Sequence, residues 1–171
     1  MRILTSVVIT AVLLAACQSA QAQRSAGSKI TGSAYEYPYF YRSADAYQES
    51  AYRHADLLRE ATSYGEPVPQ AIVQEHTTAI RQNVQAAGKK YAALRKLAGD
   101  HSQVKKHLDA IDAHHKAVLA HADQIDAHAK SGAGDAAAVG QSSHAAAESL
   151  KGAQVEHEKL MQYFATPPAK K

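Results

Sequence analysis

Apolar residues recur every three or four positions along four stretches of the chain, which is the spacing of an amphipathic helix. The third stretch is the most regular, and its apolar side consists of Val104, Leu108, Ile111, His115, Val118, Ala122 and Ile125. The pattern predicts four helices, over about 44–64, 69–98, 101–131 and 136–165.

Residues typical of helix ends flank these stretches. Ser43 and Asp135 are expected N-caps, and Asp100 with Gln103 resembles a capping box. Gly99 is expected to end the second helix. Because three short connections join long helices, neighbours must run antiparallel. The predicted fold is therefore an all-α, up-down-up-down four-helix bundle over residues 43–166, followed by a tail at 167–171.

Residues 17–42 precede the predicted bundle. Their first part is small, polar and rich in serine and glycine, which favours a flexible tether. Their second part is rich in tyrosine and is expected to run extended around Pro38. It is interpreted as a strap that packs against the helices, with an exposed aromatic patch as the alternative.

The composition favours closely packed helices. Hydrophobic residues make up 46% of the 171 positions, but Trp is absent and Phe occurs twice, so the core must consist largely of small side chains. The 19 basic residues nearly balance the 16 acidic ones. Such a balance argues against a nucleic-acid surface.

The chain begins with Arg2, an uncharged apolar run over residues 3–16, and Cys17. The run is shorter than the length of a typical transmembrane helix and is typical of a secretory signal. The sequence Leu14-Ala15-Ala16-Cys17 resembles the lipobox of bacterial lipoproteins. That resemblance implies cleavage before Cys17, a lipid on its sulfur and anchorage in the outer membrane, facing the periplasm. The alternative is cleavage after Ala22, which releases a soluble periplasmic or secreted protein.

Motifs of common enzymes are missing. The chain has no CxxC, HExxH, GxSxG or glycine-rich phosphate loop. A diiron bundle requires Glu-x-x-His pairs on two helices. Here Glu75 adjoins His76, and Glu156 adjoins His157, so in neither pair can both residues point at one metal ion. We expect a protein that is not an enzyme.

Histidines of the third helix recur every seven residues, at His107, His114, His121 and His128. Successive members are about 10 Å apart along a helix, so no two can share one ion. The spacing accompanies an internal duplication, since the residues from Ile111 recur two heptads later from Ile125. The neighbouring His115 points inward, and Gly88 and Gly152 are expected to make room for its ring.

Counting residues back from the two turns at one end of the bundle predicts a layer with one histidine from each helix. Its members are His54, His76, His121 and His144. Four imidazoles at one level suit zinc, copper, nickel or cobalt.

Three hypotheses follow. The first is a membrane-anchored metal buffer, chaperone or sensor. The second is an envelope adaptor that binds a protein partner and whose histidines are structural. The third is a bundle that loses stability in acid because its buried histidines resist protonation.

Overall fold

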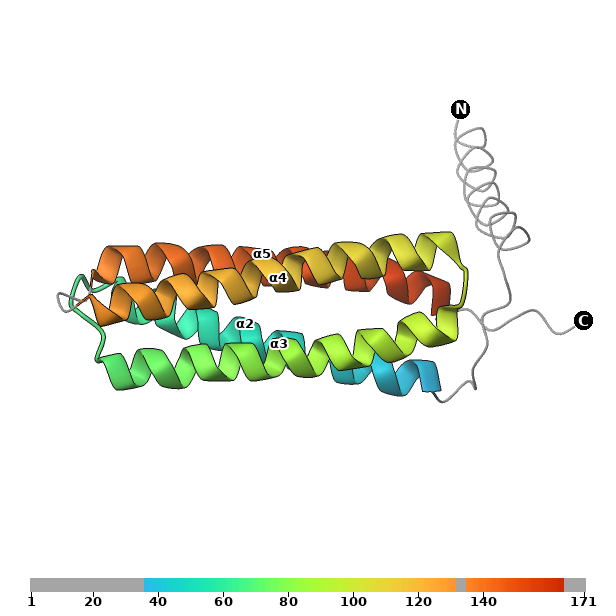
Figure 1. Ribbon diagram of the computed structural model, residues 1–171, viewed down its shortest axis with the longest axis horizontal. Helices are drawn as coiled ribbons and strands as arrows, with labels where there is room; N and C mark the ends of the chain where they lie inside the picture. Colours follow the sequence, from blue (N-terminus) through green and yellow to red (C-terminus); the bar gives the residue numbers. More distant parts are fainter. Residues whose placement is uncertain (1–35, 132–134, 165–171) are drawn as a thin grey trace, which may run out of the picture.

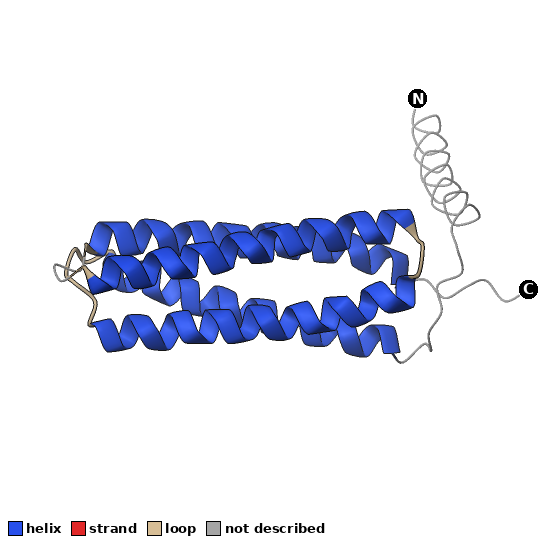
Figure 2. Cartoon of the chain, viewed as in Figure 1, coloured by secondary structure: helices blue, strands red, loops and turns tan. Residues whose placement is uncertain are grey.

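The computed structural model describes residues 36–131 and 135–164. Within them the chain forms four helices, which are α2 (Glu36–Thr62), α3 (Gln70–Ala98), α4 (Ser102–Lys130) and α5 (Ala136–Phe164). The helices lie side by side in alternating directions (Figure 1), and short connections join them (Figure 2). Each helix packs against two others, in the cyclic order α2, α3, α4, α5. The predicted antiparallel four-helix bundle is confirmed.

The ends of α3, α4 and α5 lie within one residue of the predicted ones. Gly99 ends α3 with a φ of 55°, a conformation that favours glycine. The Ala138 N–H donates to Asp135 Oδ1 at 3.1 Å, as expected for an N-cap. The cap of α4 differs from the prediction. His101 replaces Asp100 there, and its Nδ1 accepts a hydrogen bond from the Val104 N–H at 3.4 Å.

The first helix begins eight residues earlier than predicted, at Glu36, so residues 36–42 are helical and do not form an extended strap. Ser43 accordingly lies inside α2 and caps nothing. Pro38 falls in the first turn, where a missing N–H leaves no helical hydrogen bond unmade. Tyr37 of this turn does pack against the bundle, since its ring stacks on Phe164 with centroids 4.7 Å apart, whereas Tyr39 is exposed.

The predicted signal at residues 1–16, Cys17, the tether and the tail at 167–171 lie outside the described residues. Among the helices that are described, none is long and apolar enough to span a bilayer.

The core has two apolar parts, one toward each end of the bundle. The part beside the α2–α3 and α4–α5 turns includes Leu58, Ile80, Ile125 and Leu150. The part beside the opposite end includes Leu94, Leu108, Ile111 and Leu160. Alanines fill buried positions on all four helices, as the composition predicts, at Ala44, Ala51, Ala55, Ala87, Ala98, Ala122, Ala146, Ala147 and Ala153.

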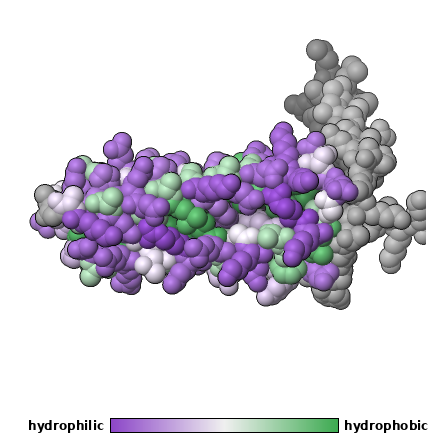
Figure 3. Space-filling view, in the orientation of Figure 1, coloured by the Kyte–Doolittle hydropathy of each residue, from purple (hydrophilic) through white to green (hydrophobic). Residues whose placement is uncertain are grey.

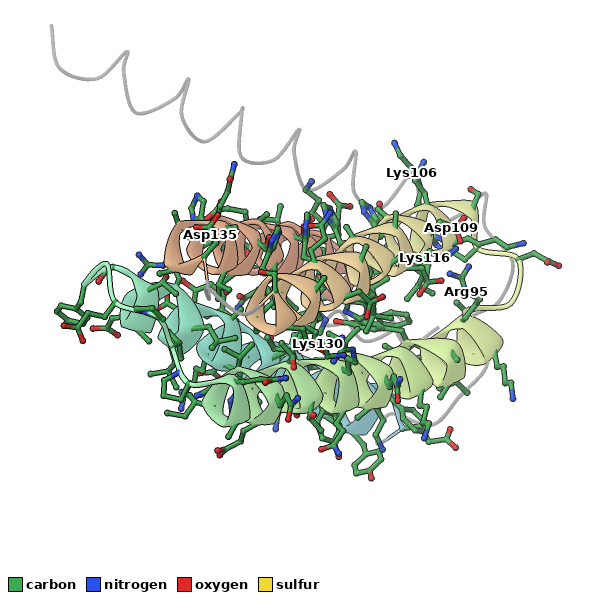
Figure 4. All side chains as sticks on the ribbon, turned by 60° about the vertical axis from the view of Figure 1, so that its left-hand side comes forward. Arg95, Lys106, Asp109, Lys116, Lys130 and Asp135 are labelled. Carbon is green, nitrogen blue, oxygen red and sulfur yellow. The ribbon has the colours of Figure 1, made fainter. Side chains whose placement is uncertain are left out.

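Ion pairs join α3 to α4 along their outer edge. Arg95 of α3 bridges two carboxylates of α4, those of Asp109 at 2.6 Å and Asp112 at 2.7 Å. Arg95 and Asp109 face each other across this seam in Figure 4. Between the two helices, the middle of the same face shows an apolar patch (Figure 3).

The same arrangement recurs two heptads away. Arg81 bridges Asp123 and Asp126, each at 2.8 Å. The duplicated segment of α4 therefore presents equivalent carboxylates to two arginines that are also fourteen residues apart. Because each arginine must contact its own two aspartates, these ion pairs fix the position of α3 along the axis of α4.

Neither Gly88 nor Gly152, the two glycines that were expected to make room for the His115 ring, has that ring beside it. A Cβ on Gly152 would lie 2.8 Å from Nδ1 of His114, the neighbouring residue, whereas a Cβ on Gly88 would meet nothing within 4 Å. Gly152 therefore lets the His114 ring lie between α4 and α5.

We predict opposite effects for alanine at these two glycines. Gly88→Ala should raise the free energy of unfolding by about 1 kcal/mol, since alanine favours helix and has room there. Gly152→Ala should lower it, because the His114 ring must leave the seam. Urea denaturation checks both values, and in a His114→Ala background the Gly152→Ala substitution should become stabilising. An equal gain at both glycines would contradict this account.

Candidate functional site

Two of the four predicted ligands meet at the α2–α3 seam. His54 of α2 and His76 of α3 have their Nδ1 atoms 2.9 Å apart, with ring centroids separated by 5.1 Å. Both rings are half-buried. One Nδ1 must carry a hydrogen and donate a hydrogen bond to the other, because two protonated nitrogens cannot approach so closely. The pKa of His76 is lowered by burial first and by the neighbouring His54 second.

His121 does not reach this pair. Thr77, next to His76, donates a hydrogen bond to Asp126 of α4 at 2.7 Å. His121 lies five residues from Asp126, or about 8 Å along the helix axis. Its Nδ1 lies instead 3.0 Å from Gln124 Oε1 on its own helix.

His144 of α5 does not reach it either. Lys151 of α5 lies over the Tyr52 ring at 5.7 Å, and this contact places His54 opposite the turn just before Lys151. His144 is about one further turn away and is exposed. The predicted four-histidine layer is therefore not formed, and residues 36–131 and 135–164 contain no group of three or more His, Cys, Asp or Glu that could hold a metal ion.

A different layer crosses the centre of the bundle, with one polar residue from each helix. Its members are Gln48, Tyr91, His115 and His157, and none is more than 5% exposed. The Tyr91 hydroxyl donates to Gln48 Oε1 and lies 2.8 Å from His157 Nδ1. The rings of Tyr91 and His115 have centroids 5.7 Å apart. Tyr91 thus contacts all three other helices.

The proton positions in this layer follow from the single hydroxyl proton. Because the Tyr91 hydroxyl donates its hydrogen bond to Gln48, the Nδ1–H of His157 must donate to the Tyr91 oxygen. The free lone pair of His157 is then on Nε2. Asp45 Oδ1 lies 4.0 Å from that Nε2. Gln48 Nε2, His115 Nε2 and His157 Nε2 are buried without a hydrogen-bond partner among the described residues.

Burial governs the titration of this layer. It lowers the pKa of His115 to about 4, against the opposing influence of Asp112. It also lowers the pKa of His157 and raises that of Tyr91. All three groups are therefore neutral near pH 7.

Two of the four heptad histidines, His107 and His114, lie at the α4–α5 seam, and the His121 ring contacts Gln124 of its own helix. His107 Nδ1 lies 2.7 Å from Glu156 Oε2, and the His114 ring occupies the space above Gly152. The carbonyl of His128 accepts the Ser131 N–H at the end of α4. Their spacing reflects helix packing and not a shared ligand.

The apolar pattern of the sequence places Tyr91, His115 and His157 on the apolar sides of their helices, but it does not identify the central layer as a unit. A signal was present, because Gln48 follows Ala44 by four residues and precedes Ala51 by three. That position belongs to the buried side of a helix. All three positions lie inside the helix that the pattern predicted over about 44–64.

Comparison of the chain with protein-family models, curated proteins and solved structures found no match. Function must therefore be inferred from the chemistry of the described residues. The central layer is closed to solvent, whereas the His54–His76 pair is half-buried and presents two ring nitrogens at one point.

We predict that acid destabilises the bundle through His115. The pKa of His115 lies below its unfolded value of about 6.5, so the unfolded chain binds the proton first. Stability should therefore fall as the pH drops from about 6.5 toward 4, and the share of His115 at pH 5 is about 2 kcal/mol.

Urea denaturation at pH 7.5 and pH 5 measures this loss. His115→Leu should reduce it by that share, and His121→Leu, at a half-exposed position, serves as the control. An identical loss in His115→Leu and the wild type would refute the assignment.

Proposed function

We propose that the protein is an exported module that binds a divalent transition-metal ion through His54 and His76 and serves as a metal buffer, chaperone or sensor. The observation that carries this proposal is the 2.9 Å separation of two Nδ1 atoms on different helices. Zinc, copper, nickel and cobalt all accept imidazole nitrogen. This ligand set is half of the one that the sequence suggested.

The separation suits such an ion. Two nitrogens that each lie about 2.0–2.1 Å from a metal are about 2.9 Å apart when they subtend a right angle, and about 3.4 Å apart in a tetrahedron. The burial that lowers the pKa of His76 also keeps its ring neutral near pH 7, the form that binds metal.

Export agrees with a metal-handling role. The apolar run and Cys17 suggest an anchor in the outer membrane that faces the periplasm, with soluble periplasmic or secreted protein as the alternative. Cys17 is the only cysteine, so ligands in the mature domain must come from other residue types.

Metal binding should raise the melting temperature. At a free metal concentration one hundred times Kd, the native state gains about 2.7 kcal/mol, or roughly 5–10 °C for a chain of this size. Thermal unfolding with Zn²⁺, Cu²⁺, Ni²⁺ or Co²⁺, compared with a chelator, measures the shift.

His54→Ala and His76→Ala should each abolish this shift, whereas His121→Ala and His144→Ala should retain it. Helix content by circular dichroism verifies that each variant folds. The proposal fails if the wild type shows no shift, or if the His76→Ala variant shows the same one.

The second candidate is an envelope adaptor that binds a protein partner. Five of the six large apolar side chains that are exposed in the described residues lie on α2, on the turn after it, or on the first turn of α3. They are Tyr39, Tyr47, Leu57, Tyr64 and Ile72. This side of the bundle is the one that a protein partner would cover.

For the adaptor, we predict that serine at Tyr39, Tyr47 and Tyr64 abolishes crosslinking in the envelope to one defined protein and leaves the melting temperature unchanged. Tyr37 is unsuitable for this test because its ring packs in the core. Val155→Ser, on the exposed side of α5, is the control. Crosslinks that survive the triple substitution would exclude this surface.

A further inference from the structure

The His54–His76 pair offers fewer ligands than a transition-metal ion requires. Zinc is almost always four-coordinate in structural sites, and copper and nickel also take four or more ligands. Two imidazoles leave at least two positions open. In the parts of the chain that the structure describes, no third His, Cys, Asp or Glu joins the pair to complete a metal-binding group.

Exposed apolar side chains flank the pair. Leu57 lies one turn after His54 on α2, and Ile72 lies one turn before His76 on α3, so each shares a side of its helix with its histidine. Their exposed fractions are 51% and 42%. Leucine and isoleucine next to an incomplete ligand set are suited to an interface that closes over the ion.

Two ion pairs neutralise charges on the α2 side of the pair, whereas Glu75 adjoins His76 on the α3 side and raises its pKa in opposition to burial. Arg53 pairs with Glu49, and Arg59 pairs with Asp56 at 2.8 Å. Both ion pairs lie on α2 within one or two turns of His54. A second surface with the same residues would therefore add a second Glu75, and the positive charge of a bound metal ion would offset the repulsion between the two carboxylates.

We infer that a second copy of this chain completes the site. A twofold axis through the ion brings His54 and His76 of both copies to one metal and covers Leu57 and Ile72 with the same surface of the partner. Such an interface is isologous, the arrangement of most homodimers. This inference rests on the proposed metal-binding function and identifies the partner that the function requires.

Native mass spectrometry of the full chain, purified as the cell processes it, measures mass and metal content in one species. With Zn²⁺ we expect a dimer that holds one ion per two chains, and a chelator should return it to monomer. The variant Leu57→Glu with Ile72→Glu keeps both histidines but should remain monomeric at zinc concentrations that dimerise the wild type. Val155→Glu, on α5, should dimerise like the wild type.

The outcomes separate the two proposals. A monomer that holds one ion per chain overturns the dimer and leaves the proposed function intact. No bound zinc in the wild type overturns both. A dimer that persists in the chelator, or in His54→Ala with His76→Ala, shows association independent of the ion and also overturns the inference.

Discussion

The buried hydroxyl of Tyr91 is the contact on which the arrangement of the four helices depends. It bonds Gln48 of α2 and His157 of α5, while the Tyr91 ring contacts His115 of α4. Leu, Ile, Val and Ala recur at similar spacings on every helix, so a slip of one heptad would still cover most apolar surface. The same slip would bury Gln48 or His157 without its partner and cost the full desolvation of those groups. The polar layer thus selects one register among several that the apolar pattern allows.

The α3–α4 seam applies a second constraint of the same kind. Arg81 and Arg95 each bridge two aspartates, and their fourteen-residue separation matches the duplication in α4. Ion pairs at the edge of a bundle contribute little stability individually. Their spacing nevertheless disfavours sliding α3 along α4 by any distance other than two full heptads. Even a slide of two heptads would leave one arginine without its carboxylates. A duplicated helix could pair in two registers, and the central layer distinguishes them because it occurs once.

The fold was predictable because its signals are local. Gly99 and Asp135 end or begin helices through their own backbone and side-chain chemistry, and both do so in the structure. Pro38 misled the prediction because proline breaks a helix interior but is tolerated in a first turn, and sequence alone did not show which applied. The four-histidine layer required the offset between helices, an error of only a few residues per helix. The contact of Thr77 with Asp126 shows that this error is enough to separate His121 from His76.

The surroundings of the histidines differ from one part of the bundle to another and decide what each ring can do. Rings in the central layer are dry, so adding a proton or an ion to them costs desolvation. Rings along the α4–α5 seam are occupied by contacts such as that of His107 with Glu156. Among the histidines of residues 36–131 and 135–164, His54 and His76 bring two ring nitrogens together where solvent can still reach them. The N–H···N bond between them uses one proton and one lone pair. The packing of α2 on α3 already orders the two rings, whereas two histidines on a flexible chain would lose conformational entropy on binding a ligand.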